Sequence, residues 1–285
     1  MTKEIPQRAG AVIIGGGVIG ASVAYHLAKL GWTDVVLLER RQFSCGTTWH
    51  AAGLVGTMRA NESQARLCEY SMAVVRDIET ETGQSTGFRQ VGSLSIAYSQ
   101  ARFEELKRVA AMNNAFGVTR VDMLTPGEIK DLYPLLETGD LLGGSWVPQD
   151  GYASPVDITA AFIKGARGRG VLCLEGIKVT GINKANGMVT GVKTTRGDIE
   201  ADYVVNCGGL WSRQIGKMVG VNIPLHACEH YYAVTEKFDD LPADLPVMRD
   251  HDKCAYYKPD AGSLLVGAFE PNAVPWGHEG IPEDF

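Results

Sequence analysis

Two short segments of the chain carry residue types and spacings that could hold a large cofactor. The first, GGGVIG at residues 15–20, satisfies G-x-G-x-x-G with glycines at 15, 17 and 20. In this pattern Gly15 permits a tight turn, Gly17 leaves room for a pyrophosphate, and Gly20 lets a helix pack closely on a strand. The segment therefore predicts a phosphate-binding turn, because the following helix offers free N–H groups and a partial positive charge.

The second segment, GTTWHAAG at residues 46–53, surrounds one imidazole and one indole with small side chains. It has poor helix propensity and no strand alternation, so we expect a loop. A neutral imidazole is a competent nucleophile, and its small neighbours would let a large group come within bonding distance of His50. The alternative is an ordinary polar histidine in a glycine-rich turn.

The elements around these segments form a βαβ unit. Ala11–Ile14 is a short apolar run, Val18–Leu30 has helical spacing, and Val35–Leu38 is a second apolar run, which together indicate buried parallel strands. Glu39 ends the second run, 19 residues after Gly20. A carboxylate there can accept hydrogen bonds from both ribose hydroxyls and disfavours the 2′-phosphate of NADP.

The rest of the chain alternates between helical and strand-rich stretches. Helices are predicted over Asn61–Thr82 and Arg102–Phe116, from Pro126, from Pro155 to about Arg167, and over Trp211–Val219; strands are predicted at Leu94–Tyr98, within 171–205 with turns at 186–187 and 196–197, and at 230–234, 255–257 and 264–266. No further βα repeats follow the first unit, which favours FAD over NAD. The predicted fold class is α/β, a Rossmann-like dinucleotide-binding domain interleaved with an α+β substrate domain that carries an antiparallel sheet. The FAD-binding part is expected at about 9–60 and 150–222, and the substrate-side part at about 85–149 and 223–285.

The composition narrows the function classes. A net charge of −6 without a basic run argues against nucleic-acid binding. The apolar stretch Ala11–Ile19 is too short to span a bilayer, and no targeting segment is seen. Six cysteines without C-x-x-C spacing suit a reduced compartment, so we expect the cytoplasm of a bacterium or the mitochondrial matrix of a eukaryote. His226 and His251, with His230 and Asp252, lack metal-ligand spacing, so no metal site is predicted.

Several of these segments together resemble a known family. The pieces AVIIGGGVIGASVAYHLAKLG, VVLLER, SCGTTWHAAGLV, YVVNCGGLW, EHYYAVTE and RDHD…YYKP…LLVGAFE, spread over residues 11–269, are similar to the glycine-oxidase/D-amino-acid-oxidase superfamily of flavoproteins. They look most like its dimethylglycine dehydrogenase and sarcosine dehydrogenase branch. The resemblance implies FAD attached covalently to His50 through the 8α-methyl group of the flavin. Relatives continue beyond this length, so we expect a C-terminally truncated chain without folate binding.

The resemblance also implies the other cofactor contacts. Val18 and Ile19 would lie at the phosphate turn, Glu39 and Arg40 at the adenosine ribose, and Val179 at the adenine. Trp211, after Gly208, would close the far side of the cofactor; the alternative is a core tryptophan that anchors a helix. The predicted cofactor-binding residues are Gly15, Gly17, Val18, Ile19, Gly20, Glu39, Arg40, Gly46, Thr47, Thr48, Trp49, His50, Ala51, Ala52, Gly53, Leu54, Val179, Gly208 and Trp211.

The reaction that the resemblance implies is oxidative demethylation of an N-methylglycine-type amine, sarcosine or dimethylglycine. A hydride would move from the N-methyl carbon to flavin N5, with dioxygen or an electron-transfer flavoprotein as final acceptor. His230 and Tyr256 are the predicted catalytic residues; a hydrogen-bonded histidine and a half-buried strand tyrosine are the alternatives. Tyr257 would point to the opposite face of a strand. Lys258 stands where the family usually shows arginine, which argues against a bidentate carboxylate clamp there.

Two other readings stay open at this point. A non-catalytic flavin-binding or regulatory paralogue could share every motif of the nucleotide site. An NAD-dependent dehydrogenase is disfavoured by the absence of continuing βα repeats.

Overall fold

The first sheet contains the predicted βαβ unit. In the computed structural model, which describes residues 4–283 and 285, β1 (Arg8–Ile14), α1 (Val18–Lys29) and β2 (Val35–Leu38) follow one another as expected. The strand order is β8-β2-β1-β11-β10-β9, with β8 (Leu172–Leu174), β2, β1 and β11 (Gly197–Asn206) parallel. The strands β9 (Val179–Ala185) and β10 (Met188–Thr194) extend this sheet as an antiparallel meander. The sheet is therefore Rossmann-like, as predicted.

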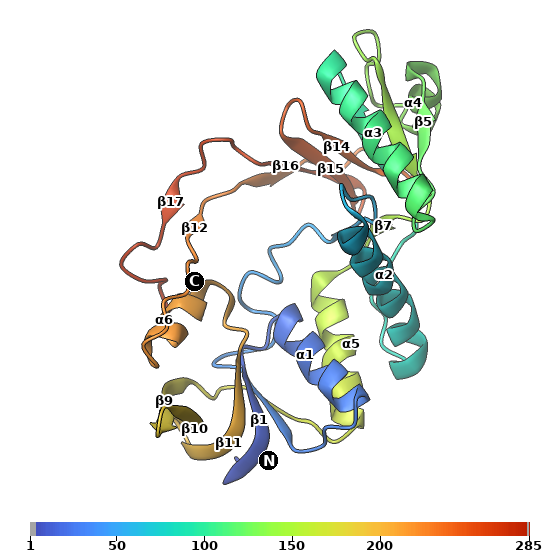
Figure 1. The fold of residues 1–285 in the computed structure, drawn as a ribbon. Helices are drawn as coiled ribbons and strands as arrows, with labels where there is room; N and C mark the ends of the chain where they lie inside the picture. Colours follow the sequence, from blue (N-terminus) through green and yellow to red (C-terminus); the bar gives the residue numbers. More distant parts are fainter. Residues whose placement is uncertain (1–3, 284) are drawn as a thin grey trace.

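Both faces of this sheet are buried, which explains the unbroken apolar runs of its strands. Ile13 and Leu37 pack against α1, α2 (Glu62–Thr82) and α5 (Pro155–Gly168), whereas Val12 and Leu38 point into a second cluster on the other face. The helices α1 and α5 approach closely at Gly165, where an added Cβ would lie 2.8 Å from the ring of Tyr25. Figure 1 shows these two helices side by side over β1.

The second sheet has seven strands in the order β13-β16-β15-β14-β4-β6-β5. All of its neighbouring pairs are antiparallel except β14 with β4. Its strands are β13 (Tyr232–Val234), β16 (Ser263–Ala268), β15 (Ala255–Asp260), β14 (Val247–Asp250), β4 (Ser93–Ala97), β6 (Gly143–Val147) and β5 (Asp122–Leu124). Leu94, Ile96 and Met248 form the core of one face together with Ile129 of α4 (Pro126–Leu132), and α3 (Gln100–Phe116) also packs on this sheet. The predicted α+β part with a mainly antiparallel sheet is confirmed, although β5, β6 and β14 were not predicted.

Two small ribbons and one short helix complete the structure. The strands β3 (Leu54–Val55) and β7 (Gly151–Tyr152) pair with each other, as do β12 (Ala227–Cys228) and β17 (Pro275–Trp276). The predicted helix 211–219 is shorter than expected: a 3₁₀ turn at Gly209–Trp211 precedes α6 (Ser212–Lys217). The prediction that a strand begins at His230 is wrong, because β13 begins at Tyr232 and His230 lies before it.

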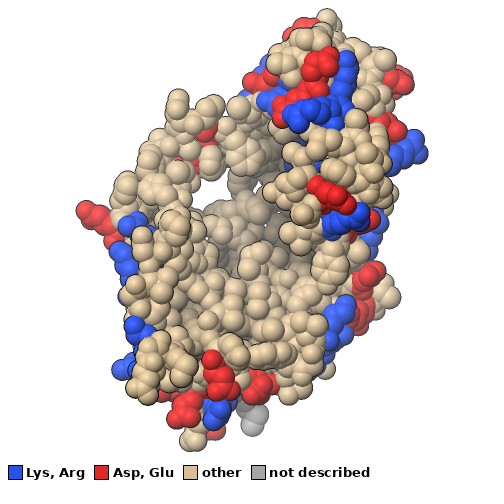
Figure 2. Space-filling view, viewed as in Figure 1, with Lys and Arg blue, Asp and Glu red and all other residues tan. Residues whose placement is uncertain are grey.

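The two sheets form two lobes. Figure 1 shows the first sheet with α1 and α5 in the lower lobe, the second sheet with α3 and α4 in the upper lobe, and α2 beside their junction. Figure 2 shows a hollow between the lobes whose visible walls carry few charged side chains. The division into two chemically distinct parts, with the ranges given above, remains a prediction.

Candidate functional site

A cavity of about 520 Å³ lies at the carboxyl ends of β1 and β2, where α1 begins. This is where nucleotide ligands bind in open α/β sheets. Thirteen of the predicted cofactor residues line it: Gly15, Gly17, Val18, Ile19, Glu39, Arg40, Gly46, Thr47, Thr48, Ala51, Val179, Gly208 and Trp211. The glycine turn, the acid after β2 and the loop that carries His50 therefore contribute to one cavity.

Three glycines of the turn have no room for a side chain. A Cβ on Gly15 would overlap the carbonyl oxygen of Cys207, and a Cβ on Gly20 would overlap that of Gly15. Gly15 also has a φ of +110°, which L side chains rarely adopt. A Cβ on Gly17 would lie 2.9 Å from the hydroxyl oxygen of Thr48. Gly20 is absent from the cavity wall, so its role is packing between helix and strand.

Glu39 is fixed at the bottom of the cavity. Its carboxylate is buried and accepts the backbone N–H of Gly16 at 2.8 Å and that of Arg41 at 2.9 Å. The thiol of Cys45 is a third donor to this carboxylate, with Sγ 3.9 Å from Oε1. A carboxylate offers about four lone-pair positions, so one is left for a ribose. The two bonds from backbone N–H groups explain why an acid directly after β2 also stabilises the glycine turn.

Arg40 and Trp211 close one side of the cavity together. The guanidinium carbon of Arg40 lies 4.0 Å from the centre of the Trp211 ring, which is a cation–π contact. The buried Nε1–H of Trp211 has no acceptor among the described residues. A buried donor of this kind is usually satisfied by a ligand or by water. The bare glycine turn and this free donor both suit a bound dinucleotide.

The loop 44–53 is held at both ends, by the glycine turn at one end and by Ala153, which follows β7, at the other. The backbone N–H of Ser44 donates to Gly16 at 3.0 Å, and the hydroxyl of Thr48 accepts the N–H of Val18 at 3.1 Å. At the far end, Gly53 has a φ of +77°, and an added Cβ would overlap the carbonyl oxygen of Ala153. The loop is therefore held against the turn that begins α1.

His50 itself does not line the cavity. Its ring centre lies 3.8 Å from that of Trp49 and 5.4 Å from that of Phe285. The other predicted residues outside the wall are Gly20, Trp49, Ala52, Gly53 and Leu54. His50 directly precedes Ala51, which does line the cavity.

The two predicted catalytic residues, His230 and Tyr256, both pack against the ring of Phe269. The ring centre of Phe269 is 5.4 Å from that of His230 and 5.4 Å from that of Tyr256. Tyr256 lies flat across Gly267, where an added Cβ would overlap its ring, and burial raises its pKa above the ordinary value. Tyr257 packs with the core cluster on the opposite face, as predicted. Neither His230 nor Tyr256 lines the 520 Å³ cavity.

His230 has a carboxylate partner that the sequence did not indicate. Its Nδ1 lies 2.9 Å from Oε2 of Glu270. The pKa of Glu270 is lowered by a hydrogen bond from its own backbone N–H and by the bond to His230. Because the residues are 40 positions apart, only the fold could reveal this pair.

The sheet face that carries Tyr256 looks toward the His50 loop. Lys258 follows Tyr256 by two residues on β15 and therefore shares its face. Its ammonium lies 5.3 Å from the ring centre of Tyr152 on β7, and Tyr152 pairs with Leu54, directly after the loop. Cofactor loop and substrate-side sheet are thus connected through β3 and β7.

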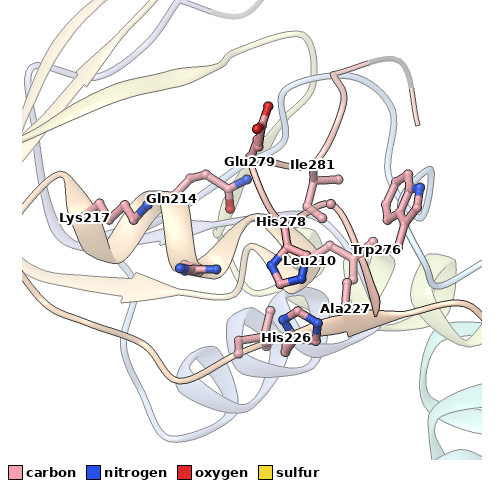
Figure 3. Close-up of a pocket in the computed structure, with 13 residues that line it drawn as sticks. Leu210, Gln214, Lys217, His226, Ala227, Trp276, His278, Glu279 and Ile281 are labelled. Atoms are coloured by element: carbon pink, nitrogen blue, oxygen red, sulfur yellow. The ribbon is translucent and has the colours of Figure 1, made fainter. Parts of the chain in front are cut away.

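A second, much smaller cavity of about 40 Å³ lies beside α6 (Figure 3). The rings of His226 and His278 lie next to each other there, with 4.7 Å between their centres and an angle of 56° between their planes. None of the predicted site residues lines it. Among residues 4–283 and 285, no three His, Cys, Asp or Glu side chains gather as metal ligands, and no helix is long and apolar enough to cross a membrane.

The fold and the large cavity define a dinucleotide-binding protein of the Rossmann class. Comparison with known proteins then places the chain more narrowly. It belongs to the FAD dependent oxidoreductase family, whose profile matches residues 11–285. The family resemblance drawn from the motifs is confirmed.

Individual relatives cover nearly the whole chain. The mitochondrial sarcosine dehydrogenase of Mus musculus is 40% identical over 281 residues, 96% of this chain and 30% of that protein. The mitochondrial pyruvate dehydrogenase phosphatase regulatory subunit of Mus musculus is 38% identical, over 97% of this chain and 32% of that protein. The crystal structure of L-proline dehydrogenase from P. horikoshii superposes with a TM-score of 0.87 at 28% identity, covering 95% of this chain and 71% of that one. The chain thus spans about a third of the length of the first two relatives.

Proposed function

We propose that the protein is a flavin-dependent oxidoreductase that oxidatively demethylates an N-methylglycine-type amine, sarcosine or dimethylglycine. The observation that carries this proposal is the single cavity to which both the glycine turn and the His50 loop contribute. The 40% identity to a sarcosine dehydrogenase supports the choice of substrate class.

FAD would lie along the cavity with its adenosine end near Glu39 and Val179 and its flavin end near the loop 46–51. The glycine turn and the start of α1 would bind the pyrophosphate, Glu39 the ribose, and Val179 the adenine, while Arg40 and Trp211 cover the cofactor. The loop 46–51 would then meet the flavin end, where His50 would form the covalent attachment. When bound, FAD supplies the two-electron acceptor for hydride from the N-methyl carbon.

The residues on the substrate-side sheet would prepare the amine. Hydride can leave the N-methyl carbon only when the nitrogen lone pair is free, so the amine must lose its proton first. The carboxylate of Glu270 would accept a hydrogen bond from Nδ1–H of His230. This bond would fix the orientation of the ring and leave Nε2 free to take the proton of the amine. Tyr256 and Phe269 would enclose the methyl group and exclude water.

The final electron acceptor would be dioxygen or an electron-transfer flavoprotein. We place the protein in the mitochondrial matrix of a eukaryote or in the cytoplasm of a bacterium. A second candidate function is a non-catalytic flavin-binding or regulatory protein. It is favoured by the 38% identity to a regulatory subunit.

Reduction of bound flavin separates the two candidates. Anaerobic addition of sarcosine or dimethylglycine to the FAD-loaded protein should bleach the flavin absorbance. Retained flavin that no N-methyl amine bleaches would support the regulatory protein instead.

Covalency is tested on the same preparation. After acid denaturation, yellow fluorescence should stay with the polypeptide, and the intact mass should exceed that of the chain by one FAD. His50→Ala should abolish both signals while reversible binding in the cavity persists. An equally firm attachment in His50→Ala would refute the role of His50.

A further inference from the structure

Arg249 lies directly opposite Tyr256 in the substrate-side sheet. The register pairs Arg249 of β14 with Tyr256 of β15 on one side and with Ser95 of β4 on the other. Directly opposite residues in neighbouring strands project to the same face. Arg249 and Tyr256 therefore share the face that looks toward the His50 loop. The sequence patterns did not indicate either β14 or this arginine.

The guanidinium of Arg249 has no bonded partner in the described part of the chain. Burial, and then the nearby charge of Arg59, lower its pKa below the ordinary value. Its side chain forms no hydrogen bond and no ion pair with any described residue. A desolvated cation without a partner is costly, because it has lost water without gaining an anion.

Asp150 is the carboxylate whose charge acts on Arg249, and it already accepts three hydrogen bonds. Its Oδ1 accepts the N–H of Thr57 at 3.0 Å and the hydroxyl of Thr57 at 2.7 Å, and its Oδ2 accepts Ser93 at 2.6 Å. Burial raises the pKa of Asp150, although Arg249 attracts it through space. Two arginines and one carboxylate leave this region with an excess of positive charge. The donors of Arg249 therefore remain available to an anion from outside.

The position of the guanidinium links the two halves of the site. A Cβ added to Gly56 would lie 3.8 Å from Nη2 of Arg249. Gly56 follows β3, which in turn follows the His50 loop. Arg249 is thus enclosed between the substrate-side sheet and the segment that leads away from the proposed flavin attachment.

Lys258 is the obvious other cation on this face, and it is already engaged. Its ammonium lies 3.2 Å from Oδ1 of Asp260 and packs on the ring of Tyr152. A planar guanidinium also matches a carboxylate with two parallel bonds, which an ammonium cannot do. Of the two cations, Arg249 is the one without a bonded anion among the described residues.

We propose that Arg249 binds the carboxylate of the amine substrate and so selects N-methyl amino acids over simple N-methyl amines. This inference rests on the proposed function. With the carboxylate held by Arg249, the nitrogen and its methyl group would extend along Tyr256 toward the flavin end. Arg249 would set affinity and orientation, while His230 would handle the proton.

Methoxyacetate, in which oxygen replaces the nitrogen of sarcosine, tests the binding step without turnover. Its dissociation constant is measured on the FAD-loaded protein from the perturbation of flavin absorbance. Loss of a charge-assisted hydrogen bond of about 1.5–3 kcal/mol predicts binding weakened about 10–150-fold in Arg249→Met. Arg249→Lys should recover part of the affinity, and neutral methoxyacetamide should bind weakly and equally to all variants.

Arg66→Met is the matched control, because Arg66 is an exposed arginine that pairs with Glu62 on the surface of α2. It should bind methoxyacetate like the original protein. Unchanged affinity in both Arg249 variants, with flavin still reduced by sarcosine, would overturn the inference and leave the proposed function intact. Affinity that depends on Arg249 without reduction by any N-methyl amine would establish the carboxylate site and refute the reaction. If Arg249→Met does not fold, Arg249→Lys decides alone, and unchanged affinity there overturns the bidentate anchor.

Discussion

The hydroxyl of Thr48 accepts the backbone N–H of Val18 at 3.1 Å and thereby joins the His50 loop to the first turn of α1. Thr48 is 8% exposed, so little water competes for this bond. Two segments that lie 30 residues apart in the chain thus form one wall of the cavity. The relationship explains why a threonine stands two residues before the histidine.

Thr48→Val should therefore weaken FAD binding. The variant keeps the shape of the side chain but leaves the Val18 N–H without its acceptor, at a cost of about 1–1.5 kcal/mol, or roughly tenfold in affinity. Titration of apoprotein with FAD in the His50→Ala background, where binding is reversible, followed by quenching of flavin fluorescence, measures the change. Thr48→Ser retains the hydroxyl and should bind nearly as well as threonine; equal affinity in the valine variant would rule out this role.

Gly20→Ala should disrupt the turn itself. The new Cβ would overlap the carbonyl oxygen of Gly15, so either the helix or the strand must move. We expect a loss of about 2–4 kcal/mol of stability, in line with other steric insertions, together with loss of FAD binding. Gly168→Ala is the control, since nothing lies within 4 Å of a Cβ there and the position is helical. Chemical denaturation should show Gly168→Ala unchanged or slightly stabilised; similar curves for both variants would refute the packing account.

Gly267→Ala should impair catalysis while leaving the cofactor in place. The added methyl group would displace the ring of Tyr256, which now lies across Gly267. Because β15 and β16 lie outside the 520 Å³ cavity, FAD affinity should not change. Rapid-mixing measurements of flavin reduction should show a rate at least tenfold lower. A rate equal to that of the original protein would separate Tyr256 from the reaction.

The raised pKa of the buried Tyr25 hydroxyl predicts that the protein loses stability at alkaline pH. Burial, and then its hydrogen bond to Glu81, raise its pKa from 10.0 to about 12. Since the folded-state pKa is the higher one, the unfolded chain loses the proton first, so the contribution of Tyr25 is complete below about pH 10 and declines as pH rises toward about 12. Tyr25→Phe should be less stable at pH 7 but should lose less of its remaining stability between pH 10 and 12. Urea denaturation at several pH values checks this, and parallel pH curves for the two proteins would contradict it.

Much of the nucleotide site could be predicted from the sequence because its signals are local. Apolar runs on both faces of β1 and β2, the spacing of Gly15, Gly17 and Gly20, and the acid after β2 each occupy a few consecutive residues. The signals for the helices predicted from Pro126 and Pro155 were equally local, and the side chains of Thr125 and Ser154 cap these two helices.

The substrate side depended on contacts between distant residues. The short run Val247–Asp250 becomes a central strand only because β4 and β15 pair with it on either side. That pairing sets Arg249 against Tyr256 and leaves its guanidinium without a bonded partner. The same holds for Glu270 beside His230 and for Gly267 beneath Tyr256.

The sequence by itself thus determined the phosphate turn, the loop and the strand–helix–strand order, since backbone conformation and burial period are written in neighbouring residues. The tertiary structure decided which side chains lie beside one another on and around the second sheet. Those contacts follow from strand register and sheet packing, which join residues far apart in the chain and leave no periodic trace in either segment alone.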